Sequence, residues 1–194
     1  MVIEIFLNLK DYSEAVAAYG NGASLPDCMP DNRNWVLHRL LSLPCAGATG
    51  VFSQLDLLSQ DFHSGKLCLE VCHLTAIMYC IHATFPVPRS MYGRQLLQLQ
   101  MKESISKIHL TTGEQELGEL SLWCVIIGGI AASGHLMRSW FTLKLFSVSN
   151  FLGLTQWSDA KGVLRKFACL DSACDQGGVT DMSHDSERSV SLSR

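Results

Sequence analysis

The segment that most constrains the fold is an apolar run from Leu122 to Ala132 that contains two adjacent glycines, Gly128 and Gly129. A helix that crosses the hydrocarbon core of a membrane needs about 20 apolar residues, and this run has only about half that length. Glu119 precedes it and His135 follows it, so neither end can be extended as apolar sequence. We therefore predict a buried core helix here and no membrane span.

The same stretch approaches the spacing of a phosphate-binding loop. Gly129 and Gly134 have the G-x4-G spacing of a Walker A motif, but the Lys and Ser or Thr that should follow are replaced by His135 and Leu136. We therefore expect no nucleotide site. An interior glycine costs about 1 kcal/mol relative to alanine, so we expect a neighbouring helix to pass close to the backbone at Gly128, and the helix to end near Gly134.

Apolar residues recur at intervals of three and four along most of the chain, and no stretch alternates as a half-buried strand does. We expect an all-α fold, a single helical domain of about six or seven helices over residues 1–175. The remaining segment, 176–194, is rich in Ser, Asp and Gly, and we expect it to be a disordered polar tail. Besides the central run, the segments with helical spacing are 1–19, 34–44, 51–62, 65–86, 90–109, 139–154 and 155–175.

Cap residues and apolar faces can be assigned in three of these segments. Asn34 is expected to cap the second helix, and Thr155 to cap the last. The helix within 90–109 is expected to be amphipathic, with an apolar face that consists of Tyr92, Leu96, Leu99 and Ile105.

Charge and cysteine content restrict the environment and the partners. The net charge is −3 and the 15 basic residues are scattered, which argues against direct nucleic-acid binding by this chain. The local concentrations Lys161, Arg165 and Lys166, and Arg89 with Arg94, are expected to be solvated. The first residues lack the pattern of a secretory signal, and most of the eight cysteines lie in apolar segments. We therefore expect an intracellular protein with free thiols.

The sequence nominates no catalytic, cofactor-binding or metal-binding residue. The closest approach to a metal site is the group Cys68, Cys72, His73, Cys80 and His82, but these residues have no C-x2-C pair and are expected to be core side chains on a buried helix. Asp171 and Asp175 share one helical face, where we expect them to be solvated. We expect no cofactor.

Five stretches resemble a known family in their order and spacing: "NWVLHRLLSLP", "CHLTAIMYCIHATFPVP", "LLQLQMKES", "LWCVIIGGIAASGHLMRSWF" and "FACLDSACDQGG". Together they resemble the C-terminal part of the regulatory domain of fungal-specific transcription factors, most strongly over 34–178. Within that region the family's Leu-Gly-Gly-Ala helix resembles 127–131, its aromatic pair resembles Trp140 and Phe141, and its aspartate-rich close resembles 170–175.

The resemblance implies an all-helical regulatory and protein-interaction domain in the nucleus, acting in fungal transcriptional regulation, for example of a metabolic gene cluster. It implies a protein partner or self-association, and the helices would present a face to a partner subunit, a co-regulator or a small effector; whether there is a small-molecule effector is left open. The family's zinc binuclear cluster is not present, so we expect no direct DNA contact. Two alternatives stay open: a helical enzyme or accessory protein with His38, His73 or His82 beside a carboxylate in a pocket, and a truncated remnant of a longer regulator.

Overall fold

The computed structural model describes residues 2–20, 29–43, 60–84, 92–110 and 114–169. Within these ranges the chain is all-α, as predicted, with seven α-helices, one π-helical turn and no strand. The elements in order are α1 (Val2–Gly20), α2 (Met29–Ser42), α3 (Gln60–Tyr79), η2 (Cys80–Thr84), α4 (Tyr92–Ser106), α5 (Gln115–Ala131), α6 (Arg138–Leu152) and α7 (Trp157–Leu164). The predicted tail and the pair Asp171 and Asp175 lie outside the described residues.

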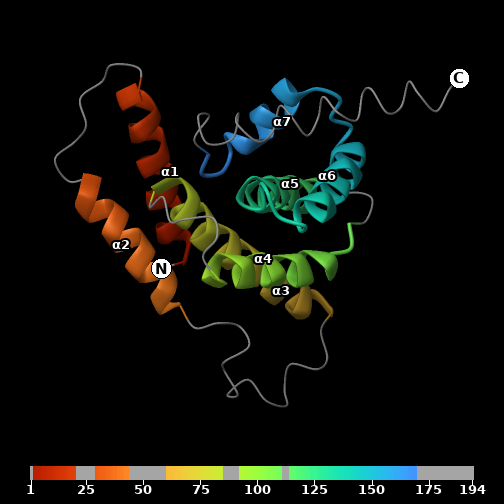
Figure 1. The fold of residues 1–194 in the computed structure, drawn as a ribbon, viewed down its shortest axis with the longest axis horizontal. Helices are drawn as coiled ribbons and strands as arrows, with labels where there is room; N and C mark the ends of the chain where they lie inside the picture. The colour runs from red at the N-terminus through yellow and green to blue at the C-terminus, as the bar shows by residue number, and fades with distance from the viewer. Residues whose placement is uncertain (1, 21–28, 44–59, 85–91, 111–113, 170–194) are drawn as a thin grey trace, which may run out of the picture.

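Helix α5 lies at the centre of the fold (Figure 1). It packs against α3, α4, α6 and α7, whereas α1 pairs with α2, which also contacts α3. Every residue from Leu122 to Ala131 is buried, so the prediction of a buried core helix is confirmed. Because neighbours cover this part of α5 on all sides, it has no polar face there.

The glycines of α5 lie where α6 approaches its backbone. A Cβ at Gly128 would overlap the Phe141 ring, lying 2.7 Å from Cζ and closer still to Cε1. At the other end of α5, a Cβ at Gly118 would lie 2.8 Å from side-chain carbons of Phe151 and Leu152. Real Cβ atoms are not found this close to other carbons, so both sites require glycine for the observed packing. The predicted close approach at Gly128 is confirmed.

The turn after α5 requires a different property of glycine. Gly134 has φ +84°, the left-handed region that residues with a Cβ rarely adopt. The helix ends at Ala131 and the chain turns at Gly134 before α6 begins. The sequence prediction placed the end of the helix correctly.

One helical stretch among the described residues, Gly65–Ala83, is long and apolar enough to cross a membrane, and 44% of it is buried inside the fold. It comprises most of α3 and of η2. A core helix passes the same test of length and composition, and Val71, Ala76 and Met78 of this stretch are fully buried.

Three predicted helix limits are wrong. Helix α2 begins at Met29, before the expected cap Asn34, because the fixed φ of Pro30 suits a first helical turn. Helix α3 begins at Gln60 and runs through Gly65, and the segment 51–59 lies outside the described residues. The last helix is only eight residues long. It is capped by Gln156 and not Thr155, and its first turn is closed by a bond from the Gln156 N–H to Asp159 Oδ2 at 3.2 Å.

Candidate functional site

Helix α4 turns a largely polar face toward the core and an apolar face toward solvent. Its buried residues are Arg94, Gln98, Met101, Ser104 and Ile105. Tyr92, Leu96 and Leu99 are 77%, 44% and 54% exposed. The prediction that these three side chains face the core is therefore wrong, and only Ile105 of the expected apolar face is buried.

The buried polar side chains of α4 each bond to a different part of the core. Gln98 Nε2 donates to the carbonyl oxygen of Ala131 at 2.9 Å, at the last residue of α5, where helical carbonyls lack a partner within the helix. Ser104 Oγ donates to Glu70 Oε1 on α3 at 2.8 Å. Buried polar groups are tolerated when they are hydrogen-bonded, so these bonds explain why this face of α4 can be buried.

Arg94 makes the third connection. Its Nη2 donates to Nδ1 of His82 on η2 at 3.0 Å, and the residue is 2% exposed. The expectation that Arg94 lies on a solvated face is thus wrong. Together with Gln98 and Ser104, it fixes which side of α4 faces inward.

The opposite side of α4 is an uncharged apolar surface, which we call the α4 stripe: Tyr92, Leu96 and Leu99. Their spacing of four and three residues places them on one helical face. The exposed positions from Tyr92 to Gln100 carry no charged side chain. Such an uncovered apolar row is a feature of interaction surfaces.

An ion pair lies just beyond the α4 stripe. Lys107 Nζ donates to Glu103 Oε1 at 2.9 Å. This bond and the accompanying charge attraction lower the pKa of Glu103 and raise the pKa of Lys107. The pair is fully exposed, and its contribution to stability is small.

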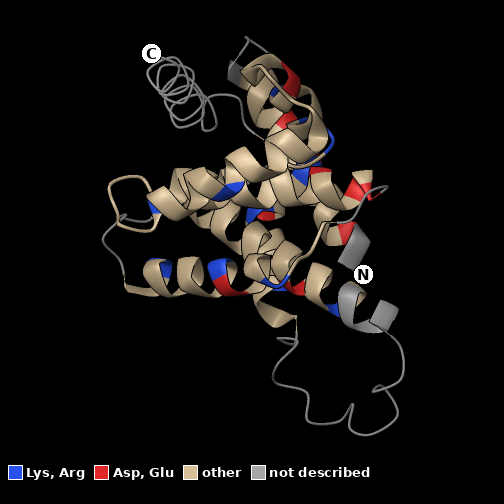
Figure 2. Cartoon of the chain, turned by 90° about the vertical axis from the view of Figure 1, so that its right-hand side faces the viewer, with Lys and Arg blue, Asp and Glu red and all other residues tan. Residues whose placement is uncertain are grey.

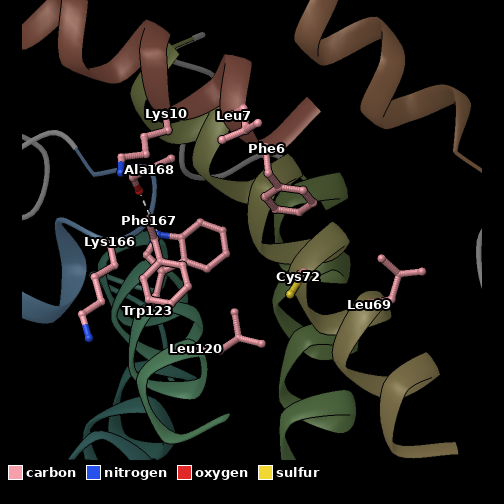
Figure 3. Close-up of a pocket in the computed structure, with 10 residues that line it drawn as sticks. All are labelled: Phe6, Leu7, Lys10, Leu69, Cys72, Leu120, Trp123, Lys166, Phe167 and Ala168. Atoms are coloured by element: carbon pink, nitrogen blue, oxygen red, sulfur yellow. Dashed lines mark hydrogen bonds between the residues drawn. The ribbon is translucent and has the colours of Figure 1, made fainter. Parts of the chain in front are cut away.

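A second feature is an apolar pocket between α1, α3, α5 and the segment that follows α7 (Figure 3). Its volume is about 340 Å³, within the range of small-molecule sites. The lining residues are Phe6, Leu7, Lys10, Leu69, Cys72, Leu120, Trp123, Lys166, Phe167 and Ala168.

Aromatic side chains form one wall of this pocket and hold each other in place. Trp123 stacks on Phe167 with ring centroids 5.6 Å apart, and Phe6 meets Trp123 edge to face at 6.4 Å. The indole Nε1 of Trp123 donates to the carbonyl oxygen of Ala168 at 2.8 Å. Since the indole N–H has its partner in the protein, the wall that it leaves facing the cavity is apolar.

The two charged side chains that line the pocket among the described residues are both lysines, and they differ in their ionic partners. Lys166 Nζ lies 2.6 and 2.7 Å from the two carboxylate oxygens of Glu119, a side chain that is only 11% exposed. Lys10 Nζ lies 3.9 Å from Glu14, which is 66% exposed. An exposed pair at that distance is weak, so the charge of Lys10 is much less compensated than that of Lys166.

The thiols near the pocket are neutral. Burial raises the pKa of Cys72 to about 12, and burial raises the pKa of Cys124 well above its ordinary value. Since the thiolate is the nucleophilic and metal-binding form, neither side chain is activated at neutral pH. Among the described residues, no group of three or more His, Cys, Asp or Glu side chains is placed to hold a metal ion.

The histidines considered for an enzyme do not converge on the pocket. His73 Nε2–H donates to the carbonyl oxygen of Leu40 at 2.7 Å, His82 accepts the bond from Arg94, and His38 is exposed on α2. Neither of the two bonds is to a carboxylate.

Acidic and basic residues lie intermixed along the described helices (Figure 2). Arg165 and Lys166 are exposed, as expected, and Lys161 is half-buried. The α4 stripe and the apolar pocket are two features of the described structure suited to binding. Leu143 and Phe146 on α6 form another exposed apolar pair, 72% and 55% exposed. No protein-family model, curated protein or solved structure matches this chain.

Sequence reasoning missed the pocket because its residues come from distant parts of the chain. Phe6, Trp123 and Phe167 have no local spacing in common, and they meet only where α1, α5 and the segment after α7 come together. The reversal of α4 did leave a signal. Leu97, Met101 and Ile105 recur at intervals of four. They lie on a different face from Leu96 and Leu99, so the sequence contains a second apolar candidate for the buried side.

Proposed function

We propose that this chain is a regulatory protein-interaction domain of the fungal transcription factor type, active in the nucleus and without a DNA-binding module of its own. It acts by self-association through the α4 stripe. The observation that supports this proposal is the reversal of α4, which exposes Tyr92, Leu96 and Leu99 while burying polar side chains. The resemblance to fungal regulatory domains supports the nuclear role.

A second copy of the chain is the partner that the α4 stripe suits best. In a two-fold contact the same patch meets itself, so a charge close to the two-fold axis would face its own copy. The exposed positions from Tyr92 to Gln100 are uncharged, which removes that repulsion. Three large side chains form a smaller patch than a permanent interface needs, so we expect a weak dimer with Kd on the order of 10 μM.

Sedimentation equilibrium of the full chain tests the association. We expect the wild type to dimerise reversibly and the double variant Leu96→Glu, Leu99→Glu to stay monomeric, because two copies would bring four carboxylates together. The matched control is Leu143→Glu on α6, a leucine that is 72% exposed but lies outside the α4 stripe. A wild type that is monomeric at several hundred micromolar, or a control as defective as the double variant, would overturn the proposed contact.

The regulatory role has its own test. Fused to an unrelated DNA-binding domain, the chain is expected to change transcription of a reporter that carries the matching DNA site. The fusion with both α4 leucines replaced by glutamate should lose the effect at equal protein level. A wild-type fusion with no effect on the reporter in a fungal host contradicts a transcriptional role, whatever the oligomeric state.

A further inference from the structure

We infer that the apolar pocket between α1, α3 and α5 binds one small amphiphile, with an apolar body of roughly a dozen carbon atoms and one anionic head group held by Lys10. This site lies away from the α4 stripe and is independent of the proposed association. Its ligand class follows from three properties of the pocket: size, lining and the charge at its rim.

The size sets the ligand's apolar body. An apolar cavity of about 150 Å³ accepts benzene, a molecule of about six carbon atoms. The pocket here is about 340 Å³, roughly twice as large, which corresponds to roughly a dozen carbons. A twelve-carbon chain or a two-ring aromatic skeleton meets this requirement.

The lining disfavours a polar ligand body. Leu120, Trp123 and Phe167 present carbon to the cavity, and the indole N–H is already bonded to Ala168. A ligand hydroxyl or amide inside the pocket would lose its water without gaining a partner there, which carries a large penalty. The polar part of the ligand must therefore lie at the rim.

The rim favours an anion. Among the described residues, Lys10 and Lys166 are the charged side chains that line the pocket, and no described carboxylate does. In Figure 3 the Lys10 side chain runs from α1 toward Ala168, and the ammonium of Lys166 points away from the aromatic rings. Lys166 is held by Glu119, while the ionic contact of Lys10 within the described part of the chain is its distant one with Glu14. Lys10 can therefore pair with a ligand carboxylate without breaking a strong existing bond.

Titration calorimetry of the full chain with three twelve-carbon probes, each below its micelle concentration, tests the inference. We expect dodecanoate to bind about tenfold more tightly than dodecanol, near the low end for a hydrogen bond to a charged group. Dodecylammonium should bind more weakly than either. Trp123 lines the pocket, so the change in tryptophan fluorescence on binding should give the same order of affinities.

Three variants locate the binding. Lys10→Met keeps most of the apolar stem and removes the charge, so dodecanoate should fall to the affinity of dodecanol. Lys144→Met on α6 is the matched control, because Lys144 does not line the pocket, and it should bind as the wild type does. Leu120→Trp should fill the cavity and weaken all three probes, with circular dichroism confirming that the variant is folded.

Each contrary outcome overturns the inference. Equal affinity for the three probes would leave an apolar pocket without anion preference, and unchanged dodecanoate binding in both Lys10→Met and Leu120→Trp would place the ligand elsewhere. No binding by the folded wild type would remove the pocket as a ligand site. Binding to anionic phospholipid vesicles in flotation, with none to monomeric dodecanoate, would identify a lipid surface instead of a free amphiphile. None of these results depends on whether the chain dimerises.

Discussion

Helices α4 and α5 lie side by side in the same core but are fixed in it by different means. Helix α5 is buried from Leu122 to Ala131 and relies on shape, with the ring of Phe141 seated on the backbone at Gly128. Helix α4 is fixed by bonds from Gln98 and Ser104 to its neighbours. A helix that is fixed by close packing needs its apolar residues in the core. A helix that is fixed by buried hydrogen bonds can leave some of its leucines exposed to solvent.

The difference identifies where the molecule has apolar surface to offer. The apolar residues of α5 from Leu122 to Ile130 are buried within the chain. In α4, Met101 and Ile105 are buried but Leu96 and Leu99 are exposed, and polar partners help to specify the orientation of that helix. A buried polar network that fixes orientation at some cost in stability is a known device, and here it leaves an apolar row available for association.

The largest effect is expected for Gly128→Leu, which tests the packing by shape. The new side chain would overlap the Phe141 ring, and separating α5 from α6 should cost about 3 kcal/mol or more, the upper end for overpacking. In a domain of this size that corresponds to a fall in Tm of about 10 °C. Thermal unfolding followed by circular dichroism measures it.

Gly129→Ala is the matched control for Gly128→Leu. A Cβ at Gly129 lies 3.5 Å from Phe141 Cβ, an ordinary contact, and alanine favours the helix over glycine by about 1 kcal/mol. The Tm should therefore stay the same or rise. An equal fall in Tm for the two substitutions would mean that α6 makes no specific close contact with the backbone at Gly128.

The next effect is expected for Gln98→Leu, which tests the packing by hydrogen bonds. The substitution removes the donor to Ala131 and leaves a buried carbonyl at the end of α5 without that bond, at a cost of about 2 kcal/mol. Urea unfolding gives the change in free energy. Gln100→Leu, at an exposed position of the same helix, should change it by less than about 0.5 kcal/mol. If Gln98→Leu leaves the free energy of unfolding unchanged, side-chain packing and not this hydrogen bond determines the orientation of α4.

These two helices also show how far the sequence predicts the structure. In α5 the pattern alone was sufficient, because a helix that is apolar on every side must lie in the core of a folded chain. The adjacent glycines within it indicate close backbone contact. In α4 two faces compete, and the choice depends on whether the polar residues find partners. Those partners, Glu70, His82 and Ala131, lie in other elements, so no local pattern could reveal them. The pocket was out of reach for the same reason.

At pH 10 the ionisation of Cys72 alone should lower the free energy of unfolding by about 1.4 kcal/mol. Its pKa in the folded chain is raised to about 12 from 9.0, so between these values the unfolded chain loses the proton and the folded chain keeps it. Stability is thus unaffected below about pH 9 and falls as the pH rises toward 12, by up to about 1.4 kcal/mol per unit. Urea unfolding from pH 8 to 10.5 measures the slope.

Cys72→Ala is the control for this pH dependence. The variant should be less stable at neutral pH because it loses buried volume, yet its stability should fall less steeply above pH 9. Cys124, whose pKa is also raised by burial, accounts for part of the remaining slope. An identical slope in wild type and variant would show that Cys72 ionises as readily in the folded chain as in the unfolded one.

The smallest effect is expected for Leu99→Ala in the α4 stripe, and its size separates folding from association. Leu99 is 54% exposed, and leucine and alanine are both good helix formers. At a few micromolar protein the free energy of unfolding should therefore change by less than about 0.5 kcal/mol.

A dimer stabilises the folded state by mass action, by about 1.4 kcal/mol at ten times its Kd. The Tm of the wild type should therefore rise with protein concentration by a few degrees, while that of Leu99→Ala should rise less. A loss above about 1 kcal/mol in dilute solution would place Leu99 in the core of the single chain, and α4 would then differ from α5 less than its exposed leucines indicate.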